Sequence, residues 1–426
     1  MPKNPATQKR LRAAHRARLA YCLLIALFLL GALPIGRAQQ QQQEPTQQKQ
    51  RPRRVGSGNS KPQPEQTQGK SSSAPTAVGE EVDEGDVVRV DTQLVSVPAV
   101  VTDKTGRPLP NLRADNFILY EDGRPQQIAN FATTEAPFEV ALLLDTSGST
   151  RADIALIRRA ARAFIDALRP GDRVSIVAFN NSEDGGRSLA TVDVLTRLTD
   201  DREALQKALE NIGASNGTPY YDALERISED VFRDSPRDEM RGRRAVVALT
   251  DGVDSASDAD YAEARSRLQR RNIACYFIQV NTEDFVEDRL LKDCEQFGTL
   301  RLSRRQLQRY RRIFVPRADA TSYEDFCRMG SFERMQISRS LYDLARREMS
   351  DLARALGGKT FPTADLRDAR AAFAQVAAEI GTQYSLGYYS TNKTRDGRFR
   401  AIRVEVRGAT QGAQVRAREG YYAPKS

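Results

Sequence analysis

Side chains that carry oxygen ligands are gathered in three short segments of this sequence. The first segment, DTSGS, contributes Asp145, Ser147 and Ser149, whose spacing of two residues lets one tight loop bring all three oxygens to a single point. Thr218, in NGTPYYDAL, and Asp251, in ALTDG, supply the same kind of atom from two later segments. Carboxylate and hydroxyl oxygens without sulfur or nitrogen suit the hard cations Mg²⁺, Mn²⁺ and Ca²⁺. The sequence therefore predicts a divalent metal site, provided that the fold brings the three segments together.

The surrounding sequence predicts the elements that would do so. Phe138 to Leu144 is a continuous apolar run, typical of a strand buried on both faces of a parallel sheet. Apolar patterning predicts further strands at 174–179, 245–249 and 273–280, an edge strand at 191–195, and helices at 154–168 and near Leu205, Leu224, Ala264, Leu344 and Phe373. This alternation is typical of a doubly wound, mostly parallel α/β domain, in which sites lie at the carboxyl ends of the strands.

Each segment alone has a simpler interpretation. Asp, Ser and Gly are ordinary residues of turns and helix caps. Thr218 would suit the cap of a helix whose first position is Pro219. The joint occurrence of the three segments, each after or beside a strand, favours the metal site. Asp222 and Asp254 lie nearby, and we interpret them as structural or solvated.

The three segments resemble the von Willebrand factor A (VWA) family. DTSGS matches the family's Asp-x-Ser-x-Ser motif, NGTPYYDAL its threonine loop and ALTDGVD its second aspartate loop, in the family's order. The resemblance implies a VWA domain at 136–382 and a metal-ion-dependent adhesion site (MIDAS) formed by Asp145, Ser147, Ser149, Thr218 and Asp251. It also implies that the serines bind Mg²⁺ (or Mn²⁺ or Ca²⁺) directly, that the aspartates act largely through water, and that Thr218 engages in the ligand-bound state. The cation then stays electrophilic, and a carboxylate from a partner protein can complete its coordination shell. The later pieces GGKTF and AFAQVAAEIGTQYSLGYY resemble the end of the domain in exported bacterial VWA-related proteins, so the resemblance extends over residues 88–426.

Strands with alternating burial are expected on both sides of this domain. One begins at Val88 and changes phase at Val95, which predicts a bulge, and the segments 116–120 and 127–131 flank a turn as in a hairpin. The alternation of apolar and polar residues returns from Tyr384, at 402–406 and at 415–417. Three strands at each end are too few for two independent sheets. Residues 88–135 and 383–426 are therefore expected to form one small β-sandwich into which the α/β domain is inserted.

Charge and hydropathy distinguish the N-terminal part of the chain. The 426 residues include 65 Lys and Arg and 56 Asp and Glu, for a net charge of +9. Residues 1–38 hold seven of the basic residues and none of the acidic ones, so the other 388 residues carry 58 basic and 56 acidic side chains. That balance does not support a nucleic-acid-binding protein.

The same leader has the features of an export signal. A basic start, an apolar run at 19–33 and the triplet Gly36, Arg37 and Ala38 predict a signal peptide at 1–38, cleaved after Ala38 or retained as an anchor. Residues 39–87 are rich in Gln, Pro and Ser, which predicts a disordered linker. We therefore expect an exported protein that is periplasmic, exposed at the cell surface or secreted.

The segment 283–330 is longer than a usual connection between a strand and a helix, and we interpret it as an insertion that leaves the metal edge of the sheet. Ser303 and Gln306 fit a capping box. One face of the helix that follows holds Leu307, Tyr310, Ile313 and Phe314, and the other holds Arg304, Arg305, Arg309, Arg311 and Arg312. This arginine face is a solvated surface, a rim that attracts an acidic partner, or a contact for an anionic membrane or nucleic acid.

The cysteines have separate expected roles. Cys294 and Cys327 bracket the insertion, and a disulfide between them would staple its base in an exported protein. Cys275 lies in the apolar strand IACYFIQV, where a buried free thiol is expected.

These features favour a binding module over an enzyme. The only histidine, His15, lies in the leader, which leaves no imidazole for Ser-His-Asp, Cys-His or His-based zinc sites. The metal segments offer hydroxyls where a hydrolase usually has several carboxylates. We expect an exported protein that holds Mg²⁺ and recruits an acidic group of a partner protein, with membrane contact only through an uncleaved leader. The alternatives are an envelope assembly scaffold with a structural metal and, less favoured, a metal-dependent hydrolase.

Overall fold

The computed structural model describes residues 94–132, 137–148, 150, 153–234, 243–292 and 300–425. The chain divides into two units, Met1–Glu84 and Gly85–Ser426, and every described residue belongs to the second. The predicted signal peptide, the predicted linker and the start of the first predicted strand lie outside the described residues. Within them, no helix has the length and apolar character needed to cross a bilayer.

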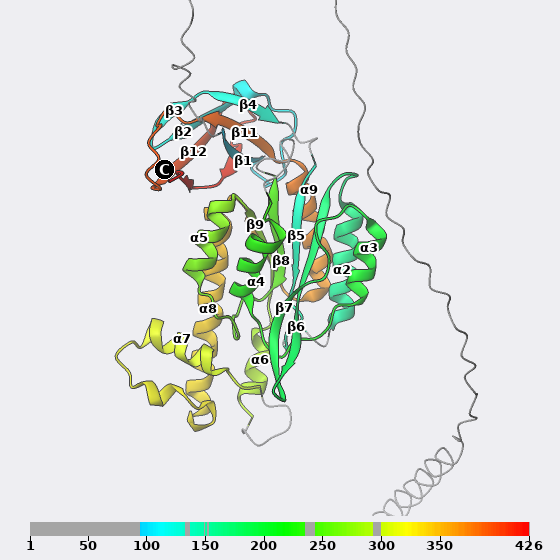
Figure 1. Cartoon of the computed structure of the whole chain (residues 1–426), viewed down its shortest axis with the longest axis vertical. Helices are drawn as coiled ribbons and strands as arrows, with labels where there is room; N and C mark the ends of the chain where they lie inside the picture. Colours follow the sequence, from blue (N-terminus) through cyan, green and yellow to red (C-terminus); the bar gives the residue numbers. More distant parts are fainter. Residues whose placement is uncertain are drawn as a thin grey trace, which may run out of the picture. The chain divides into compact units, whose positions relative to one another are not determined.

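A six-stranded sheet forms the centre of the α/β domain (Figure 1). Its strands, in spatial order, are β10 (Lys359–Thr363), β9 (Ala274–Val280), β8 (Arg244–Thr250), β5 (Glu139–Leu144), β6 (Arg173–Asp184) and β7 (Arg187–Val194). All neighbouring pairs are parallel except β6 and β7, which form an antiparallel hairpin. The predicted doubly wound architecture is confirmed. After β5 the chain adds β6 and β7 on one side of it, and then adds β8, β9 and β10 on the other side. The direction in which strands are added therefore reverses between β5 and β8.

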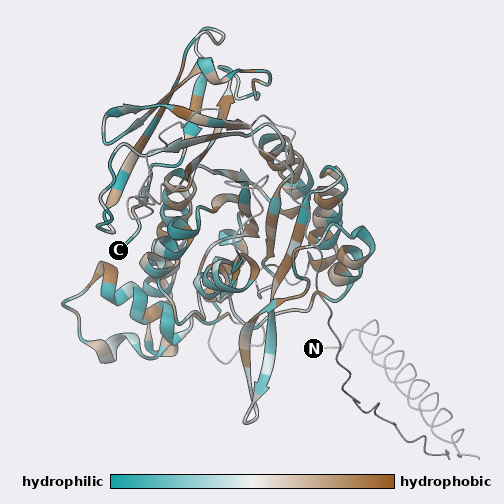
Figure 2. Cartoon of the chain, turned by 45° about the horizontal axis from the view of Figure 1, so that its top comes forward, coloured by the Kyte–Doolittle hydropathy of each residue, from teal (hydrophilic) through white to brown (hydrophobic). Residues whose placement is uncertain are grey.

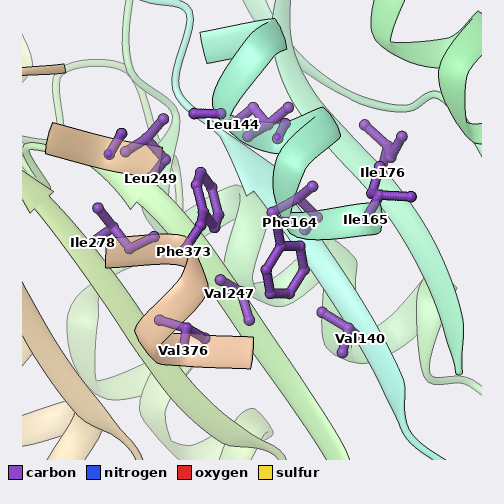
Figure 3. Packing of buried hydrophobic residues seen from close by; sticks show 14 of the residues in the cluster. Val140, Leu144, Phe164, Ile165, Ile176, Val247, Leu249, Ile278, Phe373 and Val376 are labelled. Atoms are coloured by element: carbon purple, nitrogen blue, oxygen red, sulfur yellow. The ribbon is translucent and has the colours of Figure 1, made fainter. Parts of the chain in front are cut away.

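Helices cover both faces of this sheet (Figure 1). One face packs against α2 (Ile154–Ala167), α3 (Arg202–Glu210) and α9 (Ala369–Gly381), and the other against α4 (Tyr220–Arg226), α5 (Tyr261–Arg271) and α8 (Ser331–Ala355). These helices carry both hydrophilic and hydrophobic residues (Figure 2), as expected for helices with one face buried against the sheet. In the first layer the rings of Phe164 and Phe373 are 5.2 Å apart and lie over Val140 and Val247 of the sheet (Figure 3). Each buried ring stabilises the fold by about 1.5–3 kcal/mol.

Strands from both ends of the described chain make a β-sandwich, as predicted. One sheet has the order β13 (Gln414–Ala417), β1 (Leu94–Thr102), β11 (Tyr384–Tyr389) and β4 (Ile128–Ala132), and the other has β14 (Gly420–Tyr422), β12 (Phe399–Val406), β2 (Phe117–Glu121) and β3 (Arg124–Gln126). A shared apolar core fills the space between them, with Val97, Leu119, Tyr384 and Leu386 fully buried. Each sheet therefore needs strands from before and after the α/β domain.

Two details of the sandwich differ from the prediction. The hairpin partner of β2 is β3, across a turn in which Asp122 and Gly123 have positive φ angles of 47° and 79°. These angles fit the tight two-residue turn that matches strand twist. The predicted partner, 127–131, instead forms β4 and pairs with β11 in the other sheet. The bulge predicted at Val95 is also wrong, because β1 pairs with β11 in unbroken register from Leu94 to Ala99.

The insertion after β9 has a small core of its own. Its elements are α6 (Glu283–Leu290), α7 (Arg304–Phe314) and short 3₁₀ turns at Ala320–Tyr323 and Phe326–Arg328, which pack against the first half of α8. The predicted capping box is confirmed. The backbone amide of Gln306 donates to Ser303 Oγ at 3.1 Å, and the backbone amide of Ser303 donates to Gln306 Oε1 at 2.9 Å. Leu307 and Tyr310 are buried as expected, whereas Ile313 is exposed.

Candidate metal centre

The two candidate aspartates leave neighbouring strands at the same edge of the sheet. Asp145 follows β5 and Asp251 follows β8, and Leu144 lies opposite Leu249 in the parallel register of these strands. The Asp145 amide donates to the Leu249 carbonyl at 3.0 Å, which keeps the two loops together past the end of the strands. This position is the crevice where the strand order reverses, the usual place for a site in such a fold.

The threonine loop is tied to both aspartate loops. The Ser215 amide donates to the Thr146 carbonyl at 2.9 Å. The Thr218 amide donates to Ser255 Oγ at 2.8 Å, and the Ser255 amide donates to the Thr218 carbonyl at 3.0 Å. These bonds hold Thr218 beside the loop that follows Asp251.

Asp145 is fully buried, and hydrogen bonds orient its carboxylate. Thr250 Oγ1 donates to Oδ2 at 2.6 Å, and the Ser147 amide donates to Oδ1 at 3.0 Å. Thr250 was not expected in the site, although its hydroxyl at the end of a buried strand, next to Asp251, was a visible signal. Its role is to orient the carboxylate of Asp145.

Asp251 is held in a similar way. Thr282 Oγ1 donates to Oδ2 at 2.6 Å, and the Val253 amide donates to Oδ1 at 3.0 Å. Thr282 also shares a hydrogen bond of 2.7 Å with the Tyr342 hydroxyl, on α8. Thr282 and Tyr342 were not predicted, because only tertiary packing brings α8 to this edge.

The electrostatics of the site fit a cation. Burial and, second, the negative charge of Asp251 raise the pKa of Asp145 to about 7. The negative charges of Asp145 and Asp251 repel each other at this buried edge of the sheet. A divalent ion bound there would offset that repulsion. Ser147 and Thr218 are also nearly buried and add the hydroxyl oxygens that suit Mg²⁺. Nowhere in the described part of the chain do three or more His, Cys, Asp or Glu side chains gather into a metal-binding group. The donor set at this edge combines two carboxylates with hydroxyls.

Three of the five predicted ligands line one cavity of about 130 Å³: Ser147, Thr218 and Asp251. Asp145 is buried beside it, and Ser149 lies outside the described residues. The structure thus brings together the described members of the predicted set.

The start of α4 differs from the prediction by one residue. Pro219, not Thr218, occupies the cap position. The amide of Tyr220 donates to Asp254 Oδ2 at 2.9 Å, and that of Tyr221 donates to Ser257 Oγ at 3.0 Å. The helix end is therefore satisfied by a loop distant in sequence, and the Thr218 side chain is not needed as a cap.

Asp254 and Asp222 are structural, as predicted. Asp254 is partly buried, and desolvation of its carboxylate raises its pKa to about 6. Asp222 accepts hydrogen bonds from the amides of Asp258 and Ala259 at 3.0 and 2.8 Å. Both carboxylates fix the loops around the site.

The arginine face of α7 is not uniform. Arg309 is largely buried: its Nη2 donates to the Tyr221 hydroxyl at 2.8 Å and to both Glu348 carboxylate oxygens at 2.8 and 2.7 Å. Its guanidinium also lies over the Tyr221 ring, 4.7 Å from the centroid. The inclusion of Arg309 among the exposed arginines was therefore an error, because Glu348 on α8 provides a buried partner.

The other four arginines lie nearer the surface. Arg305 donates to the Ala256 carbonyl at 2.8 Å and forms an ion pair with Asp258. Arg311 is partly buried, and its Nε donates to the Ala318 carbonyl at 2.9 Å. Arg304 and Arg312 are exposed.

The prediction for Cys275 is confirmed, because it is a free thiol, fully buried in β9. Cys294 lies outside the described residues, and Cys327 is not a free thiol. The pairing of Cys294 with Cys327 stays a prediction.

Comparison with known proteins finds one family model that matches the central part of the chain. Residues 139–294 match the model of the von Willebrand factor type A domain family. No curated protein matches the chain by sequence. Among solved structures, proximal thread matrix protein 1 from the mussel byssus is 13% identical with a TM-score of 0.37, covering 67% of this chain and 50% of that one. A von Willebrand factor type A protein from Catenulispora acidiphila is also 13% identical with a TM-score of 0.37, covering 79% of this chain and 75% of that one. This chain spans half the length of the mussel protein.

Proposed function

We propose that this chain binds a partner protein through a divalent cation, because residues 139–294 match the von Willebrand factor type A domain, commonly a protein-interaction module. The proposed cation is Mg²⁺, with Mn²⁺ or Ca²⁺ as substitutes. Its proposed ligands are Asp145, Ser147, Ser149, Thr218 and Asp251. When bound, the cation supplies an electrophilic position that a carboxylate of the partner can occupy.

One observation carries this proposal: two hydroxyls and one carboxylate, from three separate loops, line one cavity. Asp145 and Asp251 are each oriented by a threonine hydroxyl at 2.6 Å, so their geometry is preset and little order has to be gained on binding. We propose no catalytic role. The chain after His15 has no imidazole that could serve as a general base, and the candidate donors are rich in hydroxyls.

The setting of this interaction is also a proposal. The leader at 1–38 and the linker at 39–87 support an exported protein on a flexible tether. A disulfide between Cys294 and Cys327 would suit that compartment. The exposed Arg304 and Arg312 would attract an acidic partner toward the metal. Their main effect would be to raise the association rate of that partner.

Capture of envelope proteins by the immobilised chain tests the proposal. Capture should require Mg²⁺, be lost with EDTA and be lost in Asp145→Ala with the fold retained. Asp258→Ala is the matched control, because Asp258 is an exposed aspartate near the site but outside the donor set. Capture that survives both EDTA and Asp145→Ala contradicts the metal-dependent mechanism.

A further inference from the structure

The cavity at the candidate metal centre has a second, apolar side. Beyond Ser147, Thr218 and Asp251, its lining includes five aliphatic side chains: Val253, in the loop after Asp251, and Val286, Leu300, Leu302 and Leu341, outside the metal loops. Val286 comes from α6, Leu300 and Leu302 precede α7, and Leu341 comes from α8. The insertion and α8 thus build a wall that the three metal loops alone do not provide.

This wall is fixed to the metal loops by hydrogen bonds. Ser303 Oγ donates to the Ser255 carbonyl at 2.7 Å, and Arg305 Nη1 donates to the Ala256 carbonyl at 2.8 Å. Ser255 is in turn bonded to the backbone of Thr218. The apolar wall therefore keeps a set position relative to the proposed cation.

The cavity also contains an unpaired buried polar group. Ser338, on α8, lines the cavity and is 1% exposed, and its Oγ has no hydrogen-bond partner among the residues that the structure describes. A buried hydroxyl is usually hydrogen-bonded, so its absence of a partner indicates a place for a polar atom of a bound molecule.

We propose that this pocket receives an aliphatic side chain next to the carboxylate that binds the cation, with Ser338 Oγ bonding the ligand's adjacent amide group. The inference rests on the proposed function and specifies its ligand as a carboxylate beside a residue such as Leu or Val. The carboxylate comes from an acidic side chain or from a chain terminus, and both present the same chemistry to the metal.

Binding of fluorescent peptides to the full chain, followed by anisotropy in Mg²⁺, tests the pocket. The probes are acetyl-Gly-Asp-Leu-Gly-amide, its Asp-Gly and Asn-Leu counterparts, and acetyl-Gly-Leu with a free carboxyl terminus. Burial of the leucine side chain should strengthen binding roughly tenfold or more over the Asp-Gly peptide. The Asn-Leu peptide should not bind. Comparison of the Asp-Leu and free-terminus probes identifies the source of the carboxylate.

Two variants at one position complete the test. Ser338→Leu fills the pocket and should remove the preference for leucine, and the loss of its hydroxyl should weaken Mg²⁺-dependent binding of both peptides. Ser338→Ala leaves the pocket open and should keep the preference. Equal, Mg²⁺-dependent binding of the Asp-Leu and Asp-Gly peptides by the wild type overturns the pocket alone, whatever the stability of the variants. Absence of Mg²⁺-dependent binding to every carboxylate probe overturns the proposed function as well.

Discussion

Replacement of Arg309 by methionine should loosen the insertion from the α/β domain. Arg309 and Glu348 have side-chain exposures of 13% and 15%, and their two contacts of 2.7 and 2.8 Å join α7 to α8. Breaking a fully buried ion pair costs about 3–5 kcal/mol, and breaking an exposed one costs about 0.2–1 kcal/mol. Since this pair is mostly buried, we expect Arg309→Met to lower the free energy of unfolding by about 2–3 kcal/mol.

Urea unfolding monitored by circular dichroism measures this change. Arg312→Met, on the exposed part of the same helix, is the matched control and should change stability by less than about 0.5 kcal/mol. A double-mutant cycle with Glu348→Gln should give a coupling energy of about 1–2 kcal/mol. If Arg309→Met costs no more than Arg312→Met, Arg309 is a solvated side chain and the structural argument is refuted.

Three further predictions concern the core and the loops. Burial raises the pKa of Asp254 from 3.8 to about 6, so the folded state holds this proton more tightly and its contribution to stability falls as the pH rises from 4 to 6. Asp254→Asn should therefore reduce the difference between the free energies of unfolding at pH 4 and pH 7, measured with urea, by at most about 3 kcal/mol. An unchanged pH dependence of the unfolding free energy would contradict the raised pKa of Asp254. Phe373→Ala should cost about 3–5 kcal/mol in the same assay, whereas Leu189→Ala, on an exposed side chain, should cost less than about 0.5 kcal/mol. Cys275 should react with a thiol reagent only after unfolding, because it is fully buried, and rapid labelling of Cys275 itself in the native chain, located by peptide mapping, would show that β9 is accessible.

Local sequence patterns predicted the parts of the molecule that depend on local physics. Continuous apolar runs identified β5, β8 and β9, because a strand covered on both faces has no polar side. The capping box of α7 was predictable for the same reason, since Ser303 and Gln306 satisfy each other's backbone amides within one turn. The places of Asp145 and Asp251 followed from the rule that parallel strands end at a common edge.

The features that sequence reasoning missed depend on contacts between distant segments. Alternation placed a strand at β4 but could not choose its partner, because β2 and β11 offer similar apolar faces. The burial of Arg309 depends on Glu348, which is 39 residues later on another helix. Thr282 and Tyr342 hold Asp251 through a similar long-range contact. Helical periodicity shows which residues share a face, but not which distant side chain covers it.

Titration of the chain with Mn²⁺, read by electron paramagnetic resonance, tests the central claim most directly. The proposed site at the ends of β5 and β8 predicts about one bound ion per chain, displaced by Mg²⁺. That ion should be lost in Asp145→Ala and retained in the matched control Asp258→Ala, with circular dichroism showing both variants folded. Retention of the bound ion in Asp145→Ala would contradict the account.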